Sequence, residues 1–132
     1  MRDFVMKTGD LLLILGSVAL SATAQLLLKL GASAPAVRAA ITDANGPMLE
    51  RGFVLMTTPP LIGGLVIYAI SAGFWIAVLS RVDLSLAYPF VGLGFVLTFL
   101  IGTLFLGETA NIMRVSGTFL IMVGAILVSR GA

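Results

Sequence analysis

The sequence has 132 residues, of which 59% are apolar and 11% are charged, with a net charge of +2 and no histidine or cysteine. A soluble domain is usually about 45–50% apolar and about 25% charged, so this chain has too few polar side chains to cover a water-facing surface. This composition disfavours a soluble enzyme, a disulfide scaffold and a histidine- or cysteine-based metal centre, and the few scattered positive charges disfavour a nucleic-acid partner. We therefore expect a small integral membrane protein that is not an enzyme and needs no cofactor or metal.

Four segments are long and apolar enough to cross a membrane. A spanning helix needs about 20 predominantly apolar residues, and the segments that meet this requirement are residues 11–30, 61–79, 84–106 and 111–129. Short joints connect the last three segments, which predicts antiparallel hairpins, and no segment shows the alternating pattern of a barrel strand. We expect an all-α fold, in one domain over residues 1–132, with four transmembrane helices.

The first of these segments has some features of a secretory signal. Two basic residues precede it, and Ala22-Thr23-Ala24 resembles a cleavage site. However, the apolar run continues through Leu28 and three further spans follow it. We expect the segment to remain as a transmembrane helix.

An insertion at about residues 33–58 separates the first two spans. Pro35 precedes one short apolar face, and Asn45-Gly46 is a turn signal before a second stretch whose apolar residues have helical spacing. Each stretch is too short to span a membrane but amphipathic enough to lie among lipid headgroups. An ordinary loop, a pair of interfacial helices that shape a lateral opening for a lipid, and a half-inserted hairpin all remain open. The two prolines Pro59-Pro60 then start the second span.

The loop charges do not choose an orientation in the membrane. The basic residues on the side of the N-terminus are Arg2, Lys7, Arg81 and Arg130, and those on the opposite side are Lys29, Arg38, Arg51 and Arg114. The positive-inside rule predicts an orientation from an excess of basic residues on one side, and here the two sides carry equal numbers. Both orientations therefore remain possible, including within one antiparallel dimer.

A polar stripe runs along one face of the first span. Ser17, Ser21, Gln25 and Lys29 recur every four residues, which places them on one side of a helix. Helix packing would explain the two serines, whereas the Gln25 amide needs up to four hydrogen-bond partners. Lys29 either extends to the membrane surface or binds an anion such as a lipid phosphate.

The second and third spans add aromatic residues to this pattern. Tyr68, Ser71 and Trp75 share one face of the second span, and Tyr88-Pro89 lies near the start of the third. Tyrosine and tryptophan commonly mark the membrane interface, but Ser71 and Trp75 fall near mid-span or just beyond it. They serve either helix packing or the lining of a cavity.

Two further features lie near the end of the chain. Gly117 and Gly124 are seven residues apart on one face of the fourth span, which suggests a packing or dimerisation seam. Glu108 lies in the last hairpin, where it is either solvated or closes the hairpin by accepting backbone N–H groups at the start of the fourth helix.

Several motifs together resemble a known family of transporters. Residues 21–29, 74–89, 106–109 and 117–124 are similar to the drug/metabolite transporter superfamily in its four-helix form, which includes the small multidrug resistance proteins. The resemblance covers all four spans but not residues 31–60. In that branch a glutamate of the first helix exchanges protons for hydrophobic cations, and its position corresponds to Ser21, which carries no titratable group at physiological pH. The third-helix tryptophan of that branch is replaced by Val91.

A second branch fits these residues better. Ser21, Gln25, Lys29 and the run Ala87-Tyr88-Pro89 resemble the small subunits of the flippase for aminoarabinose linked to undecaprenyl phosphate. This resemblance implies a transporter of the bacterial inner membrane that moves a polyprenyl phosphate-linked sugar or a related lipid. The substrate-binding residues expected on this basis are Ser21, Gln25, Lys29, Ser71, Trp75, Tyr88 and Pro89.

Four short helices barely enclose a transport pathway, which predicts a dimer. The expected assembly is a homodimer, possible in antiparallel form, or a heterodimer with a related subunit, with Gly117 and Gly124 in the contact. Two other functions stay open: an exporter of small amphiphiles that uses Asp10 or Glu108 as its proton site, and a non-transporting accessory subunit of a membrane glycosyltransferase.

Overall fold

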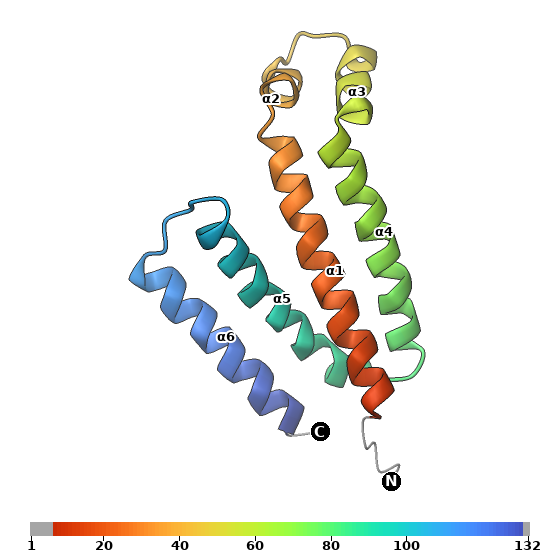
Figure 1. The fold of residues 1–132 in the computed structure, drawn as a ribbon, viewed down its shortest axis with the longest axis vertical. Helices are drawn as coiled ribbons and strands as arrows, with labels where there is room; N and C mark the ends of the chain where they lie inside the picture. Colours follow the sequence, from red (N-terminus) through yellow and green to blue (C-terminus); the bar gives the residue numbers. More distant parts are fainter. Residues whose placement is uncertain (1–6, 131–132) are drawn as a thin grey trace.

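A computed structural model describes residues 7–130, and within this range the chain is helical and contains no β-strand (Figure 1). The described helices are α1 (Thr8–Ala32), α2 (Pro35–Thr42), α3 (Met48–Thr57), α4 (Pro59–Leu79), α5 (Leu84–Leu104) and α6 (Ile112–Arg130). The predicted all-α fold is confirmed. Arg2, which entered the charge count above, lies outside the described residues.

The helices α1, α4, α5 and α6 are the described ones that are long and apolar enough to cross a membrane. Their bounds differ from the predicted spans by at most three residues. The largest difference is at α1, which begins at Thr8 because the polar residues before Leu11 already adopt helical geometry. Both ends of the described chain lie at the same end of the bundle (Figure 1), as four spans require.

Proline begins two of the helices, as the sequence indicated. Pro59 and Pro60 occupy the first positions of α4, where the missing N–H groups need no helical partner. The carbonyl of Thr58 accepts the N–H groups of Leu61 and Ile62 at 3.1 and 3.2 Å. Pro35 likewise begins α2.

The helices α1 and α4 pack closely at two glycines. A Cβ atom added at Gly31 would lie 2.6 Å from Cγ of Leu61, and one added at Gly64 would lie 3.0 Å from the backbone nitrogen of Leu28. Any larger residue would have to push the helices apart. Small residues permit such close approach in membrane proteins, where packing replaces the hydrophobic effect as the main attraction between helices.

The buried core lies toward the end of the bundle where α4 turns into α5. Its fully or nearly fully buried side chains are Ile14, Val18, Val78, Val82, Leu86 and Ala87. At the same end, the guanidinium of Arg81 lies 3.9 Å from the carboxylate of Asp10. This cluster joins α1 to both α4 and α5.

The last helix is packed differently from the others. α1 lies between α4 and α5, and α6 lies on the outer side of α5 (Figure 1). A Cβ added at Gly92 of α5 would lie 3.3 Å from Ile121, so these two helices approach closely at that point. None of residues 112–130, all of which the structure describes, is buried.

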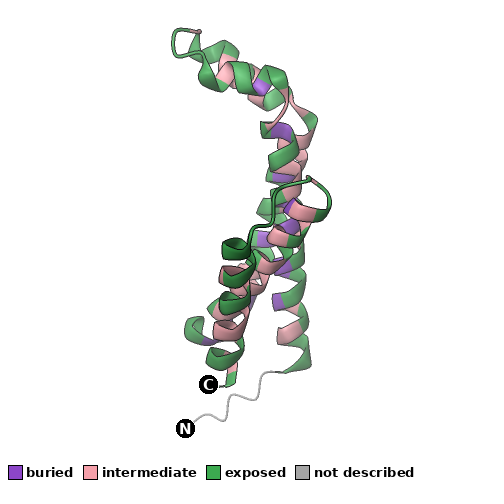
Figure 2. Ribbon diagram, turned by 90° about the vertical axis from the view of Figure 1, so that its left-hand side faces the viewer, coloured by how far each residue is buried: buried purple, intermediate pink, exposed green. Residues whose placement is uncertain are grey.

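The insertion forms two short helices, as in one of the three arrangements that the sequence left open. α2 and α3 lie beyond the ends of α1 and α4 and bend to one side of that pair (Figure 2). Arg51 of α3 joins them, because its Nε donates to the carbonyl of Ala40 at 2.6 Å. Met48 and Leu49 are 82% and 88% exposed. The position of this apolar face among lipid headgroups stays a prediction.

Candidate functional site

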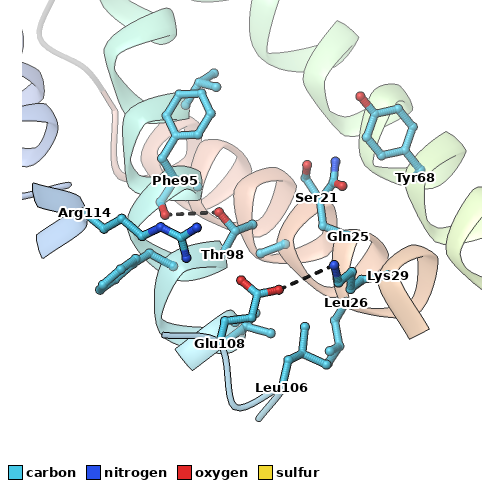
Figure 3. Close-up of a pocket in the computed structure, with 16 residues that line it drawn as sticks. Ser21, Gln25, Leu26, Lys29, Tyr68, Phe95, Thr98, Leu106, Glu108 and Arg114 are labelled. Carbon is cyan, nitrogen blue, oxygen red and sulfur yellow. Dashed lines mark hydrogen bonds and ion pairs between the residues drawn. The ribbon is translucent and has the colours of Figure 1, made fainter. Parts of the chain in front are cut away.

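A large cavity lies between α1 and α5 (Figure 3). Its volume is about 720 Å³, and it is lined by Ser21, Ala22, Gln25, Leu26, Lys29, Tyr68, Val91, Gly94, Phe95, Thr98, Phe99, Ile101, Gly102, Leu106, Glu108 and Arg114. Its α1 wall contains three members of the predicted polar stripe. A drug-sized ligand usually needs a cleft of about 300–1,000 Å³, so this cavity can hold a headgroup.

The polar stripe of α1 divides into two parts with different surroundings. Ser17 is buried, and its hydroxyl donates to the carbonyl of Ser71 at 3.2 Å, while the Ser71 hydroxyl donates to the carbonyl of Ser17 at 2.9 Å. This reciprocal pair binds α1 to α4. Ser21, Gln25 and Lys29 instead line the cavity. Ser17 thus joins two helices and borders only a smaller adjoining cavity, whereas the other three residues line the larger one.

Charged side chains gather at one end of the cavity. Nζ of Lys29 lies 3.7 Å from Oε1 of Glu108, and their side chains are 56% and 43% exposed. Arg114 lines the same cavity, and Figure 3 shows its guanidinium directed into this space. Its Nη1 donates to the carbonyl of Thr109 at 3.0 Å. Two cations and one carboxylate therefore face the polar end of the cavity.

The turn before α6 positions Glu108 for this contact. Gly107 adopts a φ of 65°, a conformation that glycine adopts at no steric cost. The backbone N–H of Glu108 then donates to the carbonyl of Gly102 at 2.9 Å. At the start of α6 a backbone N–H is accepted by Asn111 and not by Glu108. The side-chain oxygen of Asn111 accepts the N–H of Arg114 at 2.9 Å. The Glu108 carboxylate is directed toward Lys29 instead.

A smaller cavity of about 240 Å³ adjoins the first one. Ser71, Trp75 and Tyr88 are among its lining residues, and the rings of Trp75 and Tyr88 meet edge to face with centroids 6.4 Å apart. Both cavities share Ser21 and Val91. Tryptophan would stand at the position of Val91 in the small multidrug resistance pattern, so the smaller side chain leaves room where the two cavities meet.

Pro89 lines neither of these two cavities, and of the other predicted site residues only Tyr88 shares its surroundings. It lines an apolar groove of about 440 Å³ with Gly92 of the same helix and Gly124 of α6. A Cβ added at Gly117 or Gly124 meets no atom of the described residues within 4 Å. The predicted glycine seam is therefore open in the protomer.

Sequence reasoning did not include several residues that line the larger cavity. Tyr68 was placed on the correct face of its helix, together with Ser71 and Trp75, but was not counted as a site residue. Arg114 entered only the loop charge count. No local pattern marks Phe95, Thr98 or Arg114 as cavity residues, because their role depends on how α5 and the last turn pack against α1.

A family model described as Small Multidrug Resistance protein matches residues 51–121, which is more than half of the chain. This chain belongs to the small multidrug resistance family. The matched range begins in α3 and ends in α6, so it does not cover the polar residues of α1. The predicted resemblance to this four-helix superfamily is confirmed.

Curated relatives connect this small multidrug resistance protein to lipid flippases. The protein is 37% identical over 117 residues, 85% of this chain and 87% of the relative, to the probable 4-amino-4-deoxy-L-arabinose-phosphoundecaprenol flippase subunit ArnF of Enterobacter sp.. It is 36% identical over 69 residues, 52% of this chain, to the probable ArnE subunit of the same flippase in Photorhabdus laumondii. That second match spans 61% of the ArnE relative, less than two thirds of its length. No solved structure matches the chain significantly.

The spans and the relatives together place the protein in a membrane. Four described helices are long and apolar enough to cross a bilayer, and the bacterial relatives given above are named as probable flippase subunits. The protein is a multi-pass protein of the bacterial inner membrane, as the sequence predicted.

Proposed function

We propose that this protein is a subunit of a flippase that moves a polyprenyl phosphate-linked sugar or a related lipid across the inner membrane. The observation that carries the proposal is the cavity lined by Ser21, Gln25 and Lys29 between α1 and α5. Polar and charged groups within membrane spans usually mark a substrate pathway. The names of the ArnE and ArnF relatives support the same class of substrate.

The geometry supports different roles for the polar residues along the cavity wall. Lys29, at the end that also holds Glu108 and Arg114, binds the phosphate, since an ammonium and a phosphate form strong charge-assisted hydrogen bonds. Ser21 and Gln25 replace the water that the sugar hydroxyls lose. The polyprenyl tail stays in the lipid while the headgroup passes along this wall, so no covalent bond is broken and the process is transport rather than catalysis.

The aromatic residues complete the proposed site. Trp75 and Tyr88 pack edge to face beside the smaller cavity and offer apolar ring faces to the sugar. Ser71 joins α4, the helix that carries Trp75, to α1, because its hydroxyl donates to the carbonyl of Ser17. Pro89 shapes the start of α5, since it lacks the N–H that would bond to the carbonyl one turn earlier.

We further infer that the working unit is a dimer. α6 has no buried residue within 112–130, and its glycines Gly117 and Gly124 have open space above them in the described structure. A second copy in antiparallel orientation, or a related subunit, would cover this helix. Transporter sites often form at the interface of such inverted repeats.

Replacement of Lys29 by methionine tests the proposed function. In vesicles with the purified protein, or with its partner subunit if one co-purifies, Lys29→Met should slow translocation of a polyprenyl phosphate-linked sugar by about tenfold or more, equivalent to about 1.4 kcal/mol. Lys7→Met makes the same chemical change at the start of α1 and should leave the rate unchanged. Equal rates for Lys29→Met and the wild type would disprove the role of Lys29. Absence of flipping together with co-purification of a glycosyltransferase would favour an accessory subunit.

A second function is favoured by one observation, the presence of Glu108 in the cavity wall. A carboxylate there could exchange a proton for a small amphiphilic cation, as an exporter requires. Asp10 lies at the opposite end of α1 beside Arg81 and is outside this cavity. Proton-coupled uptake of a cationic dye into vesicles, abolished by Glu108→Gln, would support the exporter over the flippase.

A further inference from the structure

The contact between Lys29 and Glu108 occupies the place where we propose that the substrate phosphate binds. Oε1 of Glu108 lies 3.7 Å from Nζ of Lys29, and Arg114 lines the same end of the cavity (Figure 3). A carboxylate and a phosphate present similar oxygen acceptors to basic side chains. Glu108 therefore resembles an internal ligand in the site.

The carboxylate of Glu108 occupies a space that Gly102 of α5 leaves open. A Cβ added at Gly102 would lie 2.8 Å from Oε2 and 3.3 Å from Cδ of Glu108. The side chain thus lies directly over the backbone of α5 at a position where glycine leaves room for it. A backbone hydrogen bond holds the same two residues together. The N–H of Glu108 donates to the carbonyl of Gly102 at 2.9 Å.

The Lys29–Glu108 ion pair is weak enough for an incoming anion to replace the carboxylate. Both of its side chains are about half exposed, and the closest nitrogen–oxygen distance is 3.7 Å. Exposed ion pairs of this kind contribute little stability. A phosphodiester, as in a polyprenyl phosphate-linked sugar, carries one negative charge on two non-bridging oxygens, as a carboxylate does, and a phosphate monoester carries up to two charges on three oxygens. Either can replace Glu108 beside Lys29, at an end of the cavity that Arg114 also lines.

We propose that Lys29 and Arg114 form an anion site that Glu108 fills in the empty protein and leaves when a phosphate binds. The anion class rests on the proposed function. In the empty state Glu108 reduces the positive charge of the cavity and joins α1 to the last hairpin. In the loaded state the phosphate takes over this link, and the hairpin carboxylate moves away from Gly102.

Two substitutions test this competition in different ways. Glu108→Gln removes the charge but keeps the size of the side chain. Gly102→Ala keeps the charge but displaces the flexible carboxylate, because the new Cβ would take the space that the carboxylate occupies. Glu50→Gln, on the exposed surface of α3, changes the net charge equally and is the matched control.

The measurement is the affinity of the full-length protein in detergent for a short-chain polyprenyl monophosphate without a sugar. Calorimetry gives the Kd, and the fluorescence of Trp75, the single tryptophan of the chain, gives a second reading from the adjoining smaller cavity. Removal of an internal competitor raises the apparent affinity, so we expect Glu108→Gln to bind about fivefold tighter or more. Gly102→Ala should shift the Kd in the same direction by less, and Glu50→Gln should match the wild type.

The outcomes separate this proposal from the proposed function. Unchanged or weaker phosphate binding by Glu108→Gln would overturn the competition, even if the protein flips lipid-linked sugars. Failure of both the wild type and Glu108→Gln to bind the monophosphate would overturn the anion site. Tighter binding by Glu108→Gln in a protein that does not flip lipids would support the anion site and refute the flippase.

Discussion

The two helix pairs of this protein are held together in different ways. α1 and α4 approach closely at Gly31 and Gly64 and exchange two hydrogen bonds between Ser17 and Ser71. Among the described helices, α6 contacts α5 alone, and none of its residues 112–130 is buried. The first pair forms a firm scaffold, whereas the outer face of the second requires lipid or another subunit. The proposed site draws from both, because Lys29 belongs to the first pair and Arg114 to the second.

Among the variants considered, Gly64→Ala should cause the largest loss of stability, because it disturbs the packing of α1 against α4. The new Cβ would lie 2.9 Å from Cγ and 3.0 Å from the backbone nitrogen of Leu28, so α1 and α4 would have to separate. We expect a loss of about 1–3 kcal/mol in the free energy of unfolding, measured by denaturation in mixed micelles.

The neighbouring glycine provides the control for this prediction. A Cβ at Gly63 would lie 3.8 Å from Cδ1 of Leu27, which is an ordinary contact, so Gly63→Ala should keep the stability of the wild type. Equal stability of the two variants would mean that close packing at Gly64 does not hold the α1–α4 pair together.

A second, intermediate effect is expected at the open glycine seam of α6. An added Cβ at Gly117 or Gly124 meets no described atom within 4 Å, and leucine at both positions would obstruct a helix that packs on this seam. The dimer population should fall by about tenfold, equivalent to about 1.4 kcal/mol, while the helical content stays constant. Cross-linking in native membranes measures the first quantity and circular dichroism the second.

Gly73→Leu is the matched change on α4, where an added Cβ also meets no described atom within 4 Å. It should leave the dimer population as it is. If the Gly117/Gly124 double variant dimerises like the wild type, the partner covers another face of α6 or of the molecule.

The smallest effect is expected from the hydroxyl pair that joins α1 to α4. Ser17→Ala and Ser71→Ala each remove one donated hydrogen bond. Side-chain hydrogen bonds within membranes average about 0.6 kcal/mol, so each variant should lose about this much unfolding free energy, and the double variant about twice as much.

Ser21→Ala removes a hydroxyl from the same face of α1 but at the cavity wall. It should leave the unfolding free energy unchanged while it slows translocation. A larger loss of stability in Ser21→Ala than in Ser17→Ala would contradict the division of the stripe into a packing part and a cavity part.

Part of the site could be predicted from sequence, and part could not. Residues Ser21, Gln25 and Lys29 were expected on one face because a spacing of four residues keeps side chains on one side of a helix. The same spacing includes Ser17, which is not in the wall of the larger cavity and hydrogen-bonds to α4. Periodicity identifies a face, but only the neighbouring helix determines where along that face a cavity opens.

Long-range contacts account for what local patterns left out. Glu108 and Arg114 reach the end of α1 because Gly107 turns the chain and α5 packs on α1. Pro89 follows Tyr88 directly in sequence and both line the groove toward α6, but of the two only Tyr88 also lines the smaller cavity. Adjacent residues of a helix point in directions about 100° apart, so their separate surroundings depend on the packing of α5.

For the insertion, the sequence left a loop, two interfacial helices and a half-inserted hairpin open. By itself it determined the membrane class and the four spans. These features follow from local properties, since the run of apolar residues and the prolines at helix starts act over one or two helical turns. The tertiary structure alone decided which polar residues line a cavity and which cation meets which carboxylate. Those relations depend on the distance between helices, and that distance is set where glycines such as Gly31 and Gly64 let two backbones approach.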